Sequence, residues 1–546
     1  MTGSVPAQIF WRWLAVGAVL VLAGCGKRDP SQPVGATGPK AKVLRLGNAA
    51  EPEDIDPQCV DGIPEHKIIM SLFEGLVTED PHDLHPVPGQ AEKWEISPDG
   101  LTYTFHLRPG LRWSDGEPLT ADDFVQSYRR MLTPALGSVY SYLLWFVAGA
   151  EDYNRGRLTD FAQVGFKAPD ASTLVVTLKS PTPFLLKVIA SHYAWMPVPV
   201  KVIARSGPLD ERHSPWTHPG NMVGNGPFRL KAWTPNQKLV VERNPFYWDQ
   251  ANVRLDGIEF YPVDDVSVEE RMFRTGLLDA TQELPLAKID TYRRDYPAEL
   301  RIEPYLGVSY YVFNVTRPPF TDPRVRRALA LAIDRESLVK NVQRGGQAPA
   351  YSLSYPGTAG YFPRARLSGG VEEARRLLAE AGYPGGKGFP ETELAYNTSE
   401  NNRILAEAIQ QMWRTNLGVD IRLHNEEWKV YRDGQRTHNF DLGRAAWIAD
   451  YIDPHVFLEI WVTGNGNNDG LYSNPEYDRL FGQALKVKTE AERYEIYQKM
   501  DAILVEDCPL VTIYHYTRVY ALSPRVKGWY PTLLDNHPCK FLDLEE

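Results

Sequence analysis

The chain has 546 residues, several times the usual length of one domain, so we expect two or three lobes. Its hydrophobic content of 43% and charged content of 23% are typical of a globular protein with large buried cores. The net charge of −10, without any long run of Lys and Arg, excludes a nucleic-acid-binding surface.

The N-terminus predicts export and a lipid anchor. Arg12 precedes an apolar run over 13–23 that is too short to be a stable membrane span. The run leads into the letters LAGC at 22–25, which are similar to a bacterial lipobox. We therefore expect 1–25 to be a lipoprotein signal peptide and Cys25 to be acylated as the mature N-terminus; an ordinary signal peptide with a chance cysteine is the alternative. Residues 26–43 are rich in Pro, Gly, Ser and Lys without periodicity, which predicts a flexible tether.

Residues 91–131 predict a hairpin followed by a helix. Apolar residues alternate with polar ones over 103–107, which is the period of a half-buried strand. Asp-Gly pairs at 99–100 and 115–116 flank the strand and predict turns. Thr120 is expected to cap the helix that follows, because acidic residues fill its first turn.

The rest of the chain shows short strands and helices without a strict βαβ rhythm or an internal repeat. Apolar runs predict strands at 174–176, 239–241 and 419–423. Asp322 and the following proline predict the start of one helix, and a second is expected over 402–417, ended by Gly418.

Three cysteines remain beyond the signal peptide: Cys59, Cys508 and Cys539. An odd number allows at most one internal disulfide and leaves one thiol. Cys508 and Cys539 are the candidate pair in an oxidising compartment, but spacing alone leaves this open.

Signals for catalysis and metal binding are missing. The chain has no nucleophile elbow, zinc-protease or Walker A motif, and the glycine-rich run at 385–388 lacks the Ser or Thr that should follow its lysine. His82 and His85 lie in a proline-rich stretch that we expect to be a turn rather than a metal site. We expect no enzyme activity, cofactor or metal.

Several strings place the chain beside a known family. They are WEISPDG at 94–100, TYTFHLR at 102–108, LRWSDG at 111–116, LTADDF at 119–124, VGNGPF at 223–228, ERNPFYW at 242–248, PFTDPRVRRAL at 319–329 and ADY at 449–451. Together they resemble bacterial extracellular solute-binding proteins of family 5, the dipeptide and oligopeptide receptors of ABC importers.

This resemblance implies an α/β fold of the periplasmic-binding-protein (Venus flytrap) type, in which two lobes face each other across a cleft. Lobe I is then expected at 44–304 plus 517–546, with an extra subdomain inserted at 79–205. Lobe II is expected at 305–516.

A receptor that accepts many peptides must bind their common parts: the ammonium, the carboxylate and the extended main chain. Residues 440–451 combine an apolar, strand-like run with both charges and resemble the main ligand-contact segment of the family. The resemblance implies that Asp450 binds the ammonium, that Arg444 contributes to carboxylate recognition, and that the backbone near Trp447 and Ile448 bonds to the peptide. The alternative for Asp450 is a helix cap, a role for which Asp453 is the better candidate. The alternative for Arg444 is a salt bridge that supports Asp450.

Two further residues match positions that line the cleft in this family, Glu65 and Trp428; their alternatives are a solvated loop acid and core packing. Two departures concern cationic anchors: Asn402 stands where well-known members have a histidine, and Gln343 where they have a lysine. The preferred peptide length and the need for a free C-terminus therefore stay open.

We accordingly expect a monomeric, membrane-anchored lipoprotein of the periplasm or cell envelope that captures oligopeptides and delivers them to ABC permease subunits. One alternative keeps the fold with another ligand: a murein peptide, a nickel chelate, haem or a sugar. A surface hydrolase or chaperone is the alternative from a different class.

Overall fold

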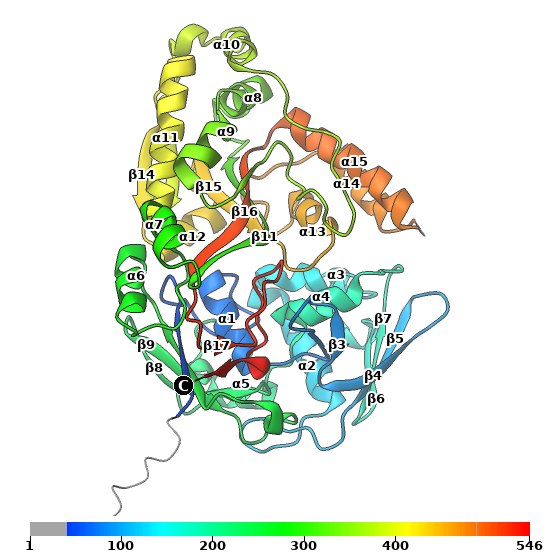
Figure 1. The fold of residues 1–546 in the computed structure, drawn as a ribbon. Coiled ribbons are helices and arrows are strands. Elements are labelled where there is room, and N and C mark those ends of the chain that lie inside the picture. The colour runs from blue at the N-terminus through cyan, green and yellow to red at the C-terminus, as the bar shows by residue number, and fades with distance from the viewer. Residues whose placement is uncertain (1–40, 488, 546) are drawn as a thin grey trace, which may run out of the picture. The chain divides into compact units, whose positions relative to one another are not determined.

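A computed structural model describes residues 41–487 and 489–545, and the chain from Lys42 onward forms one compact unit. Cys25, the signal peptide and most of the expected tether lie outside the described residues. Figure 1 shows the order of the helices and strands.

The first sheet has four strands in the spatial order β1-β10-β9-β8. Their bounds are β1 Val43–Gly47, β10 Gly257–Tyr261, β9 Lys238–Arg243 and β8 Phe228–Thr234. β1 pairs with β10 in parallel, and the other pairs are antiparallel. Helix α1 (Ile63–Leu72) packs beside β8, and α6 (Val266–Arg274) follows β10. β1 begins at Val43, so the last residue of the range expected to be a tether is part of this sheet.

A second, antiparallel sheet lies within the range expected to be an inserted subdomain. It contains β4 (Ala91–Ile96), β5 (Thr102–Leu107), β7 (Thr173–Thr177) and β6 (Phe166–Asp170). Helix α2 (Ala121–Leu132) packs on β6 and β7, and Thr120 forms a capping box with Asp123. The predicted strand and its alternating buried face are confirmed, as is the capped helix. The shorter elements here are β2 Val77–Glu79, β3 Pro86–Pro88, α3 Ala150–Asn154, α4 Leu185–Ser191 and α5 Val200–Ser206.

The third sheet has six strands in the order β12-β16-β11-β15-β13-β14. Their bounds are β12 Ala348–Pro349, β16 Leu510–Ala521, β11 Leu300–Phe313, β15 Leu442–Ile448, β13 Glu393–Asn397 and β14 Arg422–Glu426. β11 and β16 pair antiparallel over most of their length and run side by side between the part with α1 and the part with the later helices (Figure 1). Their register shifts between Pro304 and Val308, and Pro304 pairs with Thr517. The two points at which the chain is predicted to cross between lobes, after residues 304 and 516, fall at this irregularity. A division into lobes at these points stays a prediction.

Helices surround this third sheet. They are α7 Ile289–Asp295, α8 Pro323–Leu331, α9 Arg335–Ser337, α10 Val371–Glu380, α11 Glu400–Leu417, α12 Trp428–Arg436, α13 His455–Leu458, α14 Pro475–Ala484 and α15 Glu490–Asp507. As predicted, Asp322 accepts a backbone hydrogen bond at the start of α8, and Gly418 ends α11 in the left-handed conformation, with φ 68°. The buried face of α11 packs into the core through Trp413, whose indole N–H donates to Leu329 at 2.9 Å.

One prediction about this part needs correction, and the pairing of Cys508 with Cys539, which the sequence leaves open, is decided by the structure. The strand expected from Val419 begins instead at Arg422, because Val419 and Ile421 are buried in the connection that leaves α11. Cys508 and Cys539 are both free thiols. Cys508 ends α15 within the core beneath the third sheet, whereas Cys539 lies with the C-terminal segment beside the first sheet. Among the described residues, no helix is both long and apolar enough to cross a membrane.

Candidate functional site

The largest group of predicted site residues lies on β15 and the residues directly after it. Burial alternates along this strand, so the side chains of Arg444, Ala446 and Ile448 share one half-exposed face while their neighbours point into the core. Residues 444–450 together line a cavity of about 180 Å³. A single strand therefore presents both predicted charges and the main chain between them to one space.

Two walls enclose this cavity. The first wall comes from α1 with the residues before it, from residues 139–144, from the end of α4 with the residues after it, and from the C-terminal segment. Its lining residues are Asp61, Gly62, Ile63, His66, Lys67, Tyr140, Ser191, His192, Tyr193, Leu534, Asp535 and Asn536. The second wall comes from β11, α12, β15 and the loop before Gly470. Its lining residues are Tyr305, Tyr310, Trp428, Tyr431, Arg432, Gln435, the 444–450 segment, Asn467 and Asp469.

The outer edge of β15 is free over most of its length. β13 pairs only with Leu442 and Gly443, and β11 occupies the opposite edge. In an antiparallel strand, backbone groups alternate between the two edges. Ala449 donates its N–H to β11, whereas the carbonyl of Arg444 accepts from a side chain on the other edge. By this alternation, the backbone groups of Ala446 and Ile448 face the free edge, where an extended ligand can pair with them.

Asp450 is a buried carboxylate without a cation to balance it. Its side chain is 12% exposed, and Oδ2 has no hydrogen-bond partner among the described residues. Among the described residues, the basic side chain within 4.0 Å of this carboxyl group is that of His192, whose Nε2 lies 3.6 Å from Oδ1. Burial raises the pKa of Asp450 well above its usual range, and Glu459 adds to that shift.

His192 does not supply the missing positive charge. Burial lowers the pKa of its imidazole well below the usual value, so the ring is neutral. Its Nδ1 accepts the N–H of Ala194 at 3.0 Å, which places the ring proton on Nε2, facing Asp450. The site therefore offers a buried acid and one neutral donor, an arrangement that a ligand ammonium would complete.

Arg444 is the complementary unbalanced charge. Its Nη2 donates to the hydroxyl of Tyr516 at 2.6 Å, while its Nε has no partner in the described part of the chain. No carboxylate of the described residues lies within 4.0 Å of its guanidinium. The predicted alternative, a salt bridge to Asp450, is absent from the residues that the structure describes.

Ion pairs join the two walls. Asp61 accepts from Arg432 at 2.7 Å and from Arg436 at 2.6 Å, both of which belong to α12. Arg436 also lies 3.3 Å from Glu53. The Asp61 side chain is only 5% exposed, so water screens these charges weakly and they hold the walls together.

The other predicted residues differ in their placement. Trp428, Trp447 and Ile448 line the cavity, but Glu65 does not. The carboxyl of Glu65 turns toward the loop before α1, where it accepts the N–H of Glu53 at 2.7 Å. Burial raises its pKa to about 7. It packs against Gly62, where a Cβ would overlap it, so its place is behind the wall rather than in it.

The remaining predictions lie outside the cavity lining. Asp453 accepts the N–H of His455, the first residue of α13, at 3.0 Å, but Pro454 rather than Asp453 holds the N-cap position. Asn402 bonds to Asn397 at the start of α11, and Gln343 is buried elsewhere.

Sequence reasoning missed much of the first wall. His192, Asn536 and Tyr140 belong to segments far apart in the chain, and no local pattern marks them. Asp61 directly precedes the family-like string that contains Glu65, and this proximity is the one sequence signal that could have indicated its role. Asp469 follows two asparagines in a loop and carried no recognisable motif.

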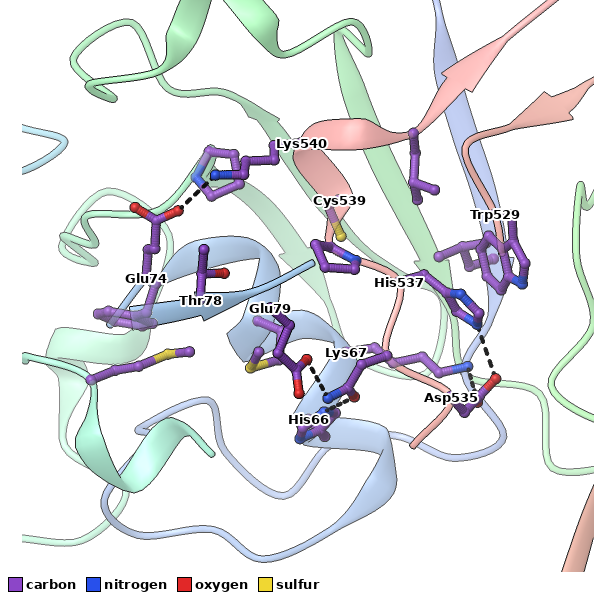
Figure 2. A pocket seen from close by; sticks show the side chains of 18 of the residues that line it. His66, Lys67, Glu74, Thr78, Glu79, Trp529, Asp535, His537, Cys539 and Lys540 are labelled. Carbon is purple, nitrogen blue, oxygen red and sulfur yellow. Dashed lines mark hydrogen bonds and ion pairs between the residues drawn. The ribbon is translucent and has the colours of Figure 1, made fainter. Parts of the chain in front are cut away.

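A second, smaller cavity of about 60 Å³ lies beside the first wall (Figure 2). Its polar side chains are already partnered: Glu74 lies 3.4 Å from Lys540, and Asp535 lies 3.4 Å from Lys67. Glu79 accepts from the Asn536 amide at 2.8 Å, and burial raises its pKa to about 8. This space has room for a small number of water molecules, so the larger cavity is the candidate ligand site.

Comparison with known proteins gives the family. The sequence profile described as "Bacterial extracellular solute-binding proteins, family 5 Middle" matches residues 85–469. The chain belongs to family 5. Proteins of family 5 are transport receptors rather than enzymes, which confirms the prediction drawn from the missing catalytic motifs.

Curated relatives and solved structures extend this family 5 match to most of the chain. The periplasmic oligopeptide-binding protein OppA of Salmonella typhimurium is 37% identical over 508 residues, covering 91% of each chain. The structure of Haemophilus influenzae OppA in complex with the peptide RPPGFSPFR has a TM-score of 0.87 and 32% identity, covering 93% of this chain and 99% of that one. The two-lobed α/β fold predicted from the sequence is therefore confirmed.

A third family 5 protein is represented by two structures. The murein tripeptide-binding protein MppA of Escherichia coli matches with a TM-score of 0.87 and 34% identity, covering 93% of this chain and 99% of that one. The unliganded open form of MppA, at the same identity, has a TM-score of 0.63 and covers 92% of this chain and 98% of that one. The arrangement of the chain from Lys42 onward is thus unlike that open form.

Proposed function

We propose that the protein is a lipid-anchored extracytoplasmic receptor that binds oligopeptides in the cavity between its two walls and delivers them to the permease of an ABC importer. One observation carries the proposal: Asp450 and Arg444 are opposite in charge, each has a buried polar atom without a hydrogen-bond partner among the described residues, and they flank a strand edge that is free over most of its length. An isolated buried charge is costly, so this arrangement is consistent with a ligand that supplies both counter-charges.

A free peptide matches these groups one by one. Its ammonium would pair with the carboxylate of Asp450, beside the neutral ring of His192. Its carboxylate would accept from the free Nε of Arg444. Its main chain pairs with the backbone of Ala446 and Ile448 along the edge of β15. Main-chain recognition of this kind gives affinity without regard to side chains, as a receptor for many peptides requires.

Closure of the walls is the proposed mechanism. The peptide first binds one wall, and the ion pairs between Asp61 and α12 then help to hold the second wall over it. The lower TM-score against the open form of MppA supports a closed arrangement as the ligand-holding state. In this proposal the closed form docks on the permease subunits as a monomer and delivers the peptide to them.

Anchoring is proposed from the sequence alone. The letters LAGC at 22–25 fit acylation of Cys25, which would hold the receptor at the cell envelope facing the periplasm. The curated relative OppA of Salmonella typhimurium is named as periplasmic, which supports the compartment but not the anchor.

A second candidate keeps the fold and changes the ligand. The resemblance to murein peptide-binding MppA, 37% identical over 489 residues, favours a murein peptide. The Arg444 and Asp450 pair suits any ligand that carries both an ammonium and a carboxylate, and it fits haem or a neutral sugar less well.

The test is identification of the bound ligand. The protein is purified under native conditions, unfolded, and the released small molecules are analysed by mass spectrometry. Linear peptides are the expected result, and after refolding they should bind again by calorimetry, whereas their N-acetylated forms should bind at least about tenfold more weakly. Release of a nickel chelate, haem or sugar, or equal binding of the acetylated peptides, would contradict the proposal.

A further inference from the structure

Charged groups of both signs line the cavity. They are four aspartates (Asp61, Asp450, Asp469 and Asp535) and three basic residues (Lys67, Arg432 and Arg444). The two lining histidines, His66 and His192, contribute no charge, since burial lowers the pKa of each imidazole.

Two of the acids are already paired. Asp535 lies 3.4 Å from Lys67 and 2.9 Å from Arg518, and Asp61 lies 2.7 Å from Arg432 and 2.6 Å from Arg436. Asp450, Arg444 and Asp469 form no ion pair with Lys, Arg, Asp or Glu within 4.0 Å in the described part of the chain. Burial raises the pKa of Asp469, and the guanidinium of Arg432, which pairs with Asp61, opposes this rise. A peptide with free termini would pair with Asp450 and Arg444, so Asp469 is the lining acid that stays without a direct partner.

Asp469 is placed to meet a ligand. Asp469 lines the cavity, and its side chain forms no hydrogen bond and no ion pair within 4.0 Å with any residue that the structure describes. The loop that carries it is held by its backbone: the Asp469 carbonyl accepts from the ring of His438 at 2.9 Å, and the next carbonyl, of Gly470, accepts from Val315 at 3.0 Å. The carboxylate is therefore presented by a fixed loop rather than by a mobile one.

Aromatic side chains line the cavity around the carboxylate. Tyr310 and Tyr431 line the same wall, and burial raises the pKa of both hydroxyls; Asp469 is the charge that adds most to the rise at Tyr310. Trp447 lines this wall as well. A carboxylate among aromatic faces suits a guanidinium or an ammonium group, because both the charge and the ring faces attract a cation.

We propose that Asp469 forms a subsite for a basic side chain of the bound peptide, so that the receptor prefers peptides that carry one Arg or Lys in addition to free termini. This inference rests on the proposed function, because it assigns the peptide termini to Asp450 and Arg444. It adds a side-chain preference that main-chain recognition alone cannot provide.

The test uses peptides that differ only in charge. Alanine peptides of three to five residues carry a single Arg at each position in turn, and a matched set carries citrulline, which has nearly the same shape but no charge. Binding to protein freed of co-purified ligand is measured by calorimetry. We expect one position at which the Arg peptide binds at least about tenfold more tightly than its citrulline partner.

Variants assign the preference to one residue. In Asp469→Asn the ratio between the Arg and citrulline peptides should fall to within about twofold, while the citrulline peptides keep their wild-type affinity; Asp469→Ser repeats the test with a smaller side chain. Asp433→Asn is the matched control, because Asp433 is an exposed acid of α12 that does not line the cavity, and it should keep the full ratio.

The outcomes separate this inference from the proposed function. If peptides bind but Arg and citrulline are equivalent at every position, or if both Asp469 variants keep the preference, the subsite is refuted and the receptor function stands. If no peptide of either set binds the wild-type protein, the proposed function fails, and the subsite fails with it.

Discussion

Replacing Asp450 by Asn should remove the main interaction with the peptide ammonium while keeping the shape of the side chain. The Asp450 side chain is only 12% exposed, and the basic side chain that lies 3.6 Å from it, His192, is neutral. The carboxylate of Asp450 is therefore the main charge available to a bound ammonium. At about 3 Å and an effective dielectric constant of about 20, the charge pair is worth roughly 5 kcal/mol. Desolvation of the ammonium opposes part of this, so we expect a loss of about 2–5 kcal/mol, or roughly 30- to 3,000-fold in Kd.

The assay is calorimetric titration of the refolded, ligand-free protein with a peptide identified from the native protein. Asp433→Asn is again the matched control, because it removes the same charge from the surface of α12 and should leave Kd unchanged. N-acetylation of the peptide should weaken binding to the wild type and have little further effect on Asp450→Asn. Unchanged affinity in Asp450→Asn, with the variant folded by circular dichroism, would refute the assignment of the ammonium site.

Three further predictions follow from the same geometry. Arg444→Met should weaken peptides with a free C-terminus at least about tenfold and leave their amidated forms nearly unaffected, as measured by calorimetry; equal losses for both would contradict a carboxylate contact. Asp61→Asn removes the charge that pairs with Arg432 and Arg436 of α12, so bound peptide should dissociate faster and its affinity should fall. Small-angle scattering of the ligand-free variant should also show a larger radius of gyration. An unchanged radius of gyration and an unchanged dissociation rate would show that these ion pairs do not hold the walls together. Because the pKa of Glu79 is raised from 4.5 to about 8 in the fold, the native state binds more protons than the unfolded state between these values, and its stability falls as pH rises through that window. Glu79→Gln should therefore match the wild type at pH 4 and be more stable at pH 8 by at most about 5 kcal/mol in urea unfolding. Equal stability of the two proteins at both pH values would count against a buried carboxyl group at this position that has an amide partner but no cationic one.

Local elements of the fold could be predicted because their signals are local. Thr120 and Asp322 mark helix starts through hydrogen bonds that span only two or three residues, and Gly418 marks a helix end through its own backbone conformation. The predicted strand begins three residues before the observed one, at Val419 instead of Arg422, because a buried connection has the same apolar composition as a buried strand.

The candidate site could be predicted only on its second wall. Arg444 and Asp450 lie on one continuous segment that resembles its family counterpart, so both charges could be named from the sequence. The facing residues, such as His192 and Asp61, come from separate segments and meet only after folding. Glu65 illustrates the limit: its string matches the family, but whether a loop acid points into a cavity or behind its wall depends on packing that no string encodes.

The central claim is that one peptide satisfies both unpaired charges and the free edge of β15. A crystal structure of the protein with its co-purified ligand tests this most directly. The account predicts an extended peptide in the cavity, with its ammonium within about 3 Å of the Asp450 carboxylate and its main chain hydrogen-bonded to Ala446 and Ile448. A ligand that leaves Asp450 and Arg444 without contacts, or that binds outside this cavity, would contradict it.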